Sequence, residues 1–263
     1  MRQYTSAAAC SNRGCIRANN EDNFFLNGEF MEKSRMDSGG VFLTRSSIKR
    51  QLYAVCDGMG GQEAGEEAAY AGVASMNGLL DSLINEDDIY GCINYYVKVV
   101  NEMVLGIGDS KNAGCTVAML YLNGGQAVVA HLGDSRVYLM RDGILRRLTE
   151  DHNEVQRLVN MGILTADQAK SHPMRHTVTR YLGMETCEIA LEPSYCQLPL
   201  RGKDLFLICS DGLTDMLEDS EIALFLRGTS SDVATKLVRA ALDKGGRDNV
   251  TAVVVKIDKL RFL

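Results

Sequence analysis

Residues 115–143 read CTVAMLYLNGGQAVVAHLGDSRVYLMRDG, a stretch in which three apolar runs of strand length are separated by short turns. The runs are residues 115–122, 126–132 and 136–140. The turn sequences NGG and RDG join the runs, and both are strong signals for tight β-hairpins. This stretch therefore predicts consecutive antiparallel strands.

Apolar runs of the same length occur on both sides of this stretch, at residues 51–56, 204–209 and 249–257. They are nearly continuous in apolar residues instead of alternating with polar ones. This composition indicates strands that are covered on both faces, as strands between stacked layers are.

Helical patterns lie between the groups of strands, at residues 62–83, 87–107 and 230–243. The last opens with SSD, which can cap a helix, and closes at Gly245. Pairs of helices beside groups of antiparallel strands predict an α+β fold built in layers. Residues 27–50 are polar and glycine-bearing, and form the one loop-like insertion; they can form a surface hairpin, touch substrates or cover a sheet edge.

Length and composition limit the possible functions. With 263 residues, 46% of them hydrophobic, the chain has enough apolar material for one large core, so we expect a single domain over residues 1–263. A net charge of -6 and a pI near 5.3 argue against nucleic-acid binding, which needs a basic face. The excess of acids suits hard divalent cations.

The eight cysteines are scattered without CxxC or zinc-like spacing. The N-terminus lacks the apolar stretch of a signal peptide, and no run is long enough to span a membrane. We therefore expect a soluble protein in a reducing cytoplasm.

Four aspartates lie at the tips of apolar strands beside small or polar residues: Asp57, Asp134, Asp211 and Asp248. Any one of them alone is more simply a turn former, because Asp-Gly is a routine turn pair. Four strand ends of this kind can converge at the edge of a sheet, where their side chains would form a carboxylate cluster.

A further acidic pair, Glu21 and Asp22, lies in RANNED, and Arg17 precedes it. Carboxylates without histidine or cysteine nearby favour magnesium or manganese, and two such ions are a general device for phosphoryl chemistry. The planar fork of arginine suits a phosphate dianion, although Arg17 taken alone reads as a surface residue.

Eight motifs spread over nearly the whole chain resemble, in the same order, those of the metal-dependent protein phosphatases of type 2C, and among them the compact bacterial serine/threonine phosphatases. The motifs are GCIRANNED (14–22), VCDGMGG with the following EAGEEAA (55–69), GCT (114–116), GDSR (133–136), LTEDH (148–152), SHPMRHTVTRYLG (171–183), CSDGLTDML (209–217) and GGRDNVTAVVV (245–255). The resemblance implies a four-layer αββα sandwich of two antiparallel sheets flanked by helices, with metals at one end.

The resemblance also implies a ligand set for two Mn²⁺ or Mg²⁺ ions. Asp57 would bridge the ions, and Asp211 and Asp248 would complete the protein ligands of the first. Glu21 and the backbone carbonyl of Gly58 would serve the second, because a carbonyl can reach a cation where a glycine lets the backbone approach closely.

Three further residues receive supporting roles by the same resemblance. Asp22 would be a supporting acid behind the ligands, and Asp134 together with Asp211 corresponds to the place of a weaker third ion. Arg17 would bind the phosphate.

A mobile flap is implied at residues 152–178, and His172 within it corresponds to a flap histidine that approaches substrate. The alternative for His172 is a loop histidine ordered by the proline that follows it.

The implied activity is hydrolysis of phosphoserine and phosphothreonine monoesters in proteins, by direct attack of a hydroxide that bridges the two metals. Phosphoproteins and a cognate serine/threonine kinase would be the partners of this signalling enzyme, which we expect to be a monomer. Met59 stands where eukaryotic members often carry a histidine proposed as general acid, and Gln62 where bacterial members often carry histidine. The proton donor therefore stays open between His172 and a metal-bound water.

Two rival hypotheses accompany this interpretation. A non-catalytic relative with a binding role predicts lost metal ligands, whereas Asp57, Asp211 and Asp248 are all present. A phosphatase for another phospho-substrate would keep every ligand and differ only around the flap and the insertion.

Overall fold

The hairpin predicted from residues 115–132 is formed by β7 (Val117–Asn123) and β8 (Gln126–Leu132), which pair antiparallel. Gly124 and Gly125 make the turn with φ of 56° and 100°, values that a residue with a side chain rarely adopts. The RDG sequence joins β9 (Arg136–Arg141) to β10 (Ile144–Arg147), so it connects a predicted strand to one that the sequence analysis did not predict.

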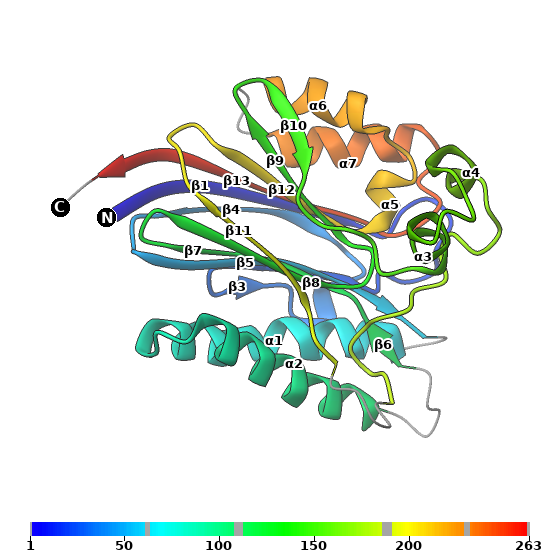
Figure 1. Cartoon of the computed structure of the whole chain (residues 1–263), viewed down its shortest axis with the longest axis horizontal. Coiled ribbons are helices and arrows are strands. Elements are labelled where there is room, and N and C mark those ends of the chain that lie inside the picture. Colours follow the sequence, from blue (N-terminus) through cyan, green and yellow to red (C-terminus); the bar gives the residue numbers. More distant parts are fainter. Residues whose placement is uncertain (1, 61–63, 108–112, 186–190, 229–231, 262–263) are drawn as a thin grey trace.

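The computed structural model describes residues 2–60, 64–107, 113–185, 191–228 and 232–261. Two antiparallel sheets stack face to face between helices, which confirms the predicted four layers (Figure 1). Gln62, Ser230 and Ser231, which belong to predicted helix starts, lie outside the described residues.

The seven-stranded sheet has the order β11-β8-β7-β5-β2-β3, and β6 pairs with β5 beyond this path. Its central strand β5 is the predicted run 51–56, extended at both ends. The remaining bounds of this sheet are β11 (Ser194–Pro199), β5 (Arg50–Met59), β2 (Asp22–Leu26), β3 (Glu29–Phe30) and β6 (Gly114–Cys115).

The six-stranded sheet has the order β10-β9-β12-β13-β1-β4. Its strands beyond β9 and β10 are β12 (Leu205–Cys209), β13 (Val250–Arg261), β1 (Arg2–Asn12) and β4 (Gly40–Ser46). The first and last strands of the chain are neighbours near its centre, paired from Arg2 and Arg261 to Asn12 and Val250.

The three predicted helices are present as α1 (Ala64–Asn85), α2 (Ile89–Leu105) and α7 (Val233–Asp243). Helices α1 and α2 cover the seven-stranded sheet, and α7 lies with α6 (Asp219–Arg227) over the six-stranded one (Figure 1). Asp88 caps α2 by accepting a hydrogen bond from Gly91 N at 2.9 Å. The short helices are η1 (Lys33–Arg35), α3 (Glu154–Asn160), α4 (Ala166–Lys170) and α5 (Asp211–Thr214).

The space between the sheets is filled by side chains from the inner faces of both. Phe24 of β2 meets Phe42 of β4 edge to face, with ring centroids 4.9 Å apart. Tyr53 of β5 is fully buried, and its hydroxyl lies 3.0 Å from the hydroxyl of Thr5 on β1. These contacts explain why the predicted strands read as continuous apolar runs, since one face meets the other sheet and the second meets helices.

Residues 27–50 contribute β3, η1 and β4. Because β3 pairs with β2 and β4 pairs with β1, the segment reaches from one sheet to the other and does not form a hairpin of its own. In the described part of the chain, no helix has the length and apolar character needed to cross a membrane.

Candidate active site

The predicted carboxylates lie at one end of the sandwich, the end where α3, α4 and α5 gather in Figure 1. Asp57 lies near the end of β5, and Asp22, the first residue of β2, is its direct partner across the two strands. Asp211 follows the end of β12, Asp248 precedes β13, and Asp134 follows β8. Antiparallel pairing brings the end of one strand beside the start of its neighbour, so the five acids meet.

Burial and repulsion by neighbouring carboxylates raise the pKa values of Asp22, Asp57 and Asp134. The pKa of Asp57 is raised well above its ordinary value, first by burial and then by the charges of Asp22, Asp211, Asp134 and Asp248. Burial also raises the pKa of Asp22 to about 7 and that of Asp134 to about 8, with Asp211 adding to both shifts. Like charges at this density need cations from outside the cluster.

Asp22 carries a buried oxygen that no described group satisfies. Its Oδ2 accepts a hydrogen bond from Ser210 Oγ at 2.7 Å, which links the two sheets, whereas Oδ1 has no partner in the described part of the chain. A buried carboxylate oxygen without a donor is costly unless a cation lies close by. Together with the all-oxygen character of the cluster, this orphaned oxygen fits hard divalent ions.

Glycine is required at position 58 because the backbone of Gly65 and of Glu21 lies directly against its Cα, where any Cβ would collide. Gly58 N donates to Glu21 O at 3.0 Å, and the side chain of Glu21 lies against Gly65 at the start of α1. Burial raises the pKa of Glu21. The predicted second-ion ligands Glu21 and Gly58 are therefore neighbours in space.

Asn249, for which the sequence motifs predict no role, holds the Glu21 loop in place. Its Oδ1 accepts from Glu21 N at 2.8 Å, and its amide donates to Arg13 O at 2.8 Å and Asn19 O at 2.9 Å. The only signal in the sequence is a second polar residue directly after Asp248, just before a buried strand.

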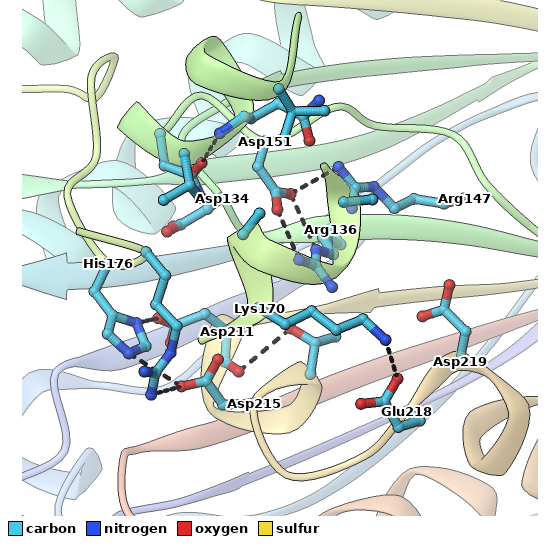
Figure 2. A pocket seen from close by; sticks show the side chains of 18 of the residues that line it. Asp134, Arg136, Arg147, Asp151, Lys170, His176, Asp211, Asp215, Glu218 and Asp219 are labelled. Atoms are coloured by element: carbon cyan, nitrogen blue, oxygen red, sulfur yellow. Dashed lines mark hydrogen bonds and ion pairs between the residues drawn. The ribbon is translucent and has the colours of Figure 1, made fainter. Parts of the chain in front are cut away.

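Two of the predicted ligands lie beside a basic side chain. Arg17 reaches Asp248 with an N to O distance of 2.6 Å, so the predicted phosphate-binding arginine lies at the cluster. His176 lies 3.6 Å from Asp211 and 3.4 Å from Asp215. Figure 2 shows the three side chains beside one another. Among the described residues, no three carboxylate, imidazole or thiol groups are already spaced as a closed metal shell.

The histidine that faces the carboxylates is His176, which sequence analysis did not single out. The nearby carboxylate of Asp211 raises the pKa of His176, although its partial burial acts in the opposite direction. His172 is half-buried and accepts a hydrogen bond from Met174 N at 3.2 Å, the local loop geometry named above as the alternative for this residue. The two histidines are four positions apart in the sequence, and only the fold decides which one faces the site.

A cavity of about 740 Å³ adjoins the cluster beneath α3 and α4. Asp134 and Asp211 lie on one side of it, and His176 enters from the segment above (Figure 2). Farther from the cluster, Arg136 grips Asp151 through two hydrogen bonds of 3.0 and 2.7 Å. The cavity thus connects the carboxylates to solvent through a polar, charged wall.

A sequence model of the family described as "Protein phosphatase 2C" matches residues 8–250. The chain belongs to this family. It is 31% identical over 257 residues to the serine/threonine phosphatase stp of Listeria monocytogenes, an alignment that covers 94% of each chain. It is 34% identical over 256 residues to PstP of Mycobacterium tuberculosis, covering 95% of this chain and 44% of that longer protein.

Solved structures of phosphatase 2C relatives share the same arrangement. The crystal structure of the M. tuberculosis phosphatase PstP superposes with a TM-score of 0.80 at 33% identity, covering 97% of this chain and all of that one. The PstP catalytic domain in complex with two manganese ions superposes with a TM-score of 0.76 at 32% identity, with the same coverage. The protein is thus a metal-dependent serine/threonine phosphatase of the 2C type, as the motifs predicted.

Proposed function

We propose that this phosphatase hydrolyses phosphoserine and phosphothreonine by direct attack of water on phosphorus, using two Mn²⁺ or Mg²⁺ ions. Asp57 would bridge the ions, with Asp211 and Asp248 on the first and Glu21 and the Gly58 carbonyl on the second. When bound, the ions would activate the water and neutralise phosphate charge. The observation that carries this proposal is the set of buried, mutually repelling carboxylates that includes the orphaned oxygen of Asp22.

The chain's own residues would position the phosphate and manage its charge. The guanidinium of Arg17, held beside Asp248, suits a phosphate dianion. Ser210 holds the Asp22 carboxylate in a fixed orientation. Asp22 would therefore act as a support behind the ligands, and Asp134 with Asp211 would hold a weaker third ion.

The leaving serine or threonine oxygen needs a proton. The candidates are a water held by the ions, His172 of the predicted flap at 152–178, and His176. His176 joins them because its imidazole lies beside Asp211 at the edge of the cavity. Comparing His172→Ala with His176→Ala on substrates that have good and poor leaving groups separates these candidates, because only loss of the proton donor spares good leaving groups.

In the cell, the substrates would be phosphoproteins made by a cognate serine/threonine kinase. We propose that the enzyme acts as a single-domain monomer in the cytoplasm. The seven described cysteines are all free, which agrees with a reducing compartment.

A direct test combines turnover with metal binding. Purified protein should hydrolyse a phosphothreonine peptide when manganese is added and lose this activity on chelation. Calorimetric titration with manganese should show binding that Asp57→Asn removes. Turnover that persists in a chelator, or unchanged manganese binding by Asp57→Asn, would contradict the assignment. A protein that binds manganese but hydrolyses only small phosphoesters would keep the metal site and reject the protein substrate.

A further inference from the structure

A groove of about 830 Å³ lies on the outer face of the six-stranded sheet, away from the carboxylate cluster. Its floor is formed by residues of the strands, and one wall is formed by residues at the end of α6 and the start of α7. Its apolar lining includes Ala8, Leu43, Met140, Leu205, Leu226 and Val254.

The strand register shows that the groove runs across the sheet. One row of paired residues passes from β9 to β4 through Met140, Leu205, Lys256, Ser6 and Arg45. The row crosses four gaps between strands, so the floor is about 19 Å long at about 4.8 Å per gap. The small side chains of β1 leave a trough between β13 and β4.

The edge strand β4 leaves apolar surface uncovered beside this trough. Leu43 is 71% exposed and Val41 is 53% exposed, and both lie on the outer face. Leu43 has Ala8 as its partner on β1, and alanine is too small to cover it. In the described part of the chain, β4 pairs on one side only. Adjoining apolar side chains exposed at a groove are typical of an interaction surface.

The rim of the groove is basic although the whole chain is acidic, with a net charge of -6. Among the described lining residues none is acidic, and four are cationic: Arg45, Lys203, Arg227 and Lys256. Lys256 has Asp258 at 3.6 Å, whereas Arg45 and Lys203 form no ion pair with any described residue. A basic rim around an apolar floor is complementary to a ligand that is both apolar and anionic.

The placement of the cations distinguishes between kinds of ligand. Arg227 lies on α6, on the helical side, whereas Arg45 and Lys256 lie on strands of the floor. A fatty acid has one carboxylate at one end and would use one cation. A segment with acidic side chains along both flanks of an apolar stripe would use cations on both sides.

We propose that this groove binds an acidic amphipathic helix of a partner protein. The strands β9, β12, β13 and β1, which form most of the floor, are paired on both sides within the sheet, so a segment that lies over them has to satisfy its own backbone, as a helix does. A floor of about 19 Å accommodates about 13 residues at 1.5 Å per residue. Leu43 would enter the apolar stripe of the helix, and Arg45 and Lys203 would pair with its acids. This binding surface is independent of the residues proposed for catalysis.

The test is selection from a displayed library of amphipathic helices of about 16 residues whose flanking positions are glutamate, glutamine or lysine. Sorting on the wild-type protein should enrich the glutamate helices. Synthetic peptides of the winning sequences should bind with affinity that falls at least about tenfold in Leu43→Glu and in the Arg45→Glu/Lys203→Glu double variant. Binding should also weaken with salt.

Matched controls are Leu224→Glu and Arg239→Glu, which alter an exposed leucine and an exposed arginine outside the groove and should leave peptide binding unchanged. All variants should keep wild-type hydrolysis of p-nitrophenyl phosphate, which verifies folding. Three outcomes would overturn the proposal. The selection yields no enriched helix, the enrichment does not depend on the charge at the flanking positions, or the selected peptides bind the groove variants as tightly as wild type.

Other occupants have distinct outcomes, and each would also overturn the proposal. The first is Leu43-dependent binding of palmitate, or of vesicles of phosphatidylcholine and phosphatidylglycerol, by a protein that binds no selected peptide. The second is a dimer in sedimentation velocity that Leu43→Glu dissociates, which would assign the groove to a second copy of the chain.

Discussion

Two sets of carboxylates in this molecule differ in whether an arginine is bound to them. Asp22, Asp57 and Asp134 face one another, and burial with mutual repulsion raises their pKa values. Asp151 and Asp204 are buried, as Asp22 and Asp134 are, but each is bound by an arginine through two hydrogen bonds. The fold can therefore supply an arginine to a buried acid, and at the cluster it does not.

This difference indicates that the acids without an arginine partner are the ones available to bind an external cation. Arg141 holds Asp204 at 2.7 and 2.6 Å, so that pair is complete within the protein. At the cluster, Arg17 is half exposed and pairs with Asp248, not with Asp22, Asp57 or Asp134. Stability and catalysis should therefore respond differently to the same Asp→Asn change in the two sets.

The largest expected effect is on turnover in Asp57→Asn. Loss of a bridging ligand should lower kcat toward a phosphothreonine peptide by at least about 10³-fold, because metal ions supply several kcal/mol of charge stabilisation. In chelator, the same variant should be at least as stable as wild type, since a repelling charge is gone. Urea unfolding measures the second point. A kcat of Asp57→Asn near that of wild type, or a large decrease in its free energy of unfolding, would contradict the proposed difference between the two sets.

Asp204→Asn should show the reverse pattern. The change leaves the guanidinium of Arg141 without its carboxylate in a largely buried site, and should lower the free energy of unfolding by about 2 to 3 kcal/mol. Its kcat in the folded state should stay near wild type, because Asp204 lies outside the catalytic end. An unchanged free energy of unfolding would show that the Asp204–Arg141 pair does not stabilise the fold, which would contradict the comparison.

The pH dependence of stability sharpens the comparison further. The folded-state pKa of Asp22, about 7, lies above its ordinary value of 3.8. At a pH between these two values, Asp22 is therefore protonated in the folded chain and ionised in the unfolded chain. The stability contributed is therefore full below about pH 4 and is lost as pH rises through about 7. In chelator, the free energy of unfolding of Asp22→Asn, taken relative to that of wild type, should increase by about 1 to 3 kcal/mol between about pH 5 and about pH 8. Parallel pH profiles of the two proteins would refute the raised pKa.

The smallest expected effect belongs to Arg17→Ala. Losing a half-exposed phosphate contact should raise KM by about tenfold, equivalent to about 1.4 kcal/mol, with a smaller change in kcat. Initial rates over a range of phosphopeptide concentration measure this split, and Arg13→Ala on the same loop serves as a control. Equal KM values for both variants and wild type would assign Arg17 to its ion pair with Asp248 alone.

Strands with strong apolar runs could be predicted closely from the sequence. The run 126–132 coincides with β8, and 204–209 differs from β12 by one residue. By contrast, β1 reads RQYTSAAACSN, whose small and polar residues carry no strand signal. It becomes a strand because β13 and β4 pair with it on either side, and such long-range pairing is invisible in a local pattern.

The candidate site could likewise be predicted only where a local pattern specifies it. Asp57 and Asp211 could be predicted because each is an acid at the end of an apolar run. The contact between Arg17 and Asp248 joins residues 231 positions apart, and nothing in either neighbourhood specifies it. The choice of His176 over His172 to face Asp211 depends on how α3 and α4 fold back over the cavity. Positions of side chains on short helices and loops are set by such tertiary contacts.

The pairing of β1 with β13 has a consequence for how the enzyme is made. A ribosome releases residues 2–12 long before residues 250–261, so β1 has to wait for its partner on one side until almost the whole described chain has been synthesised. Asp248, just before β13, arrives with it. The nascent chain can form the α1–α2 half early, but the catalytic end closes last, and a truncated product would lack both a completed sheet and the means to act on phosphoproteins.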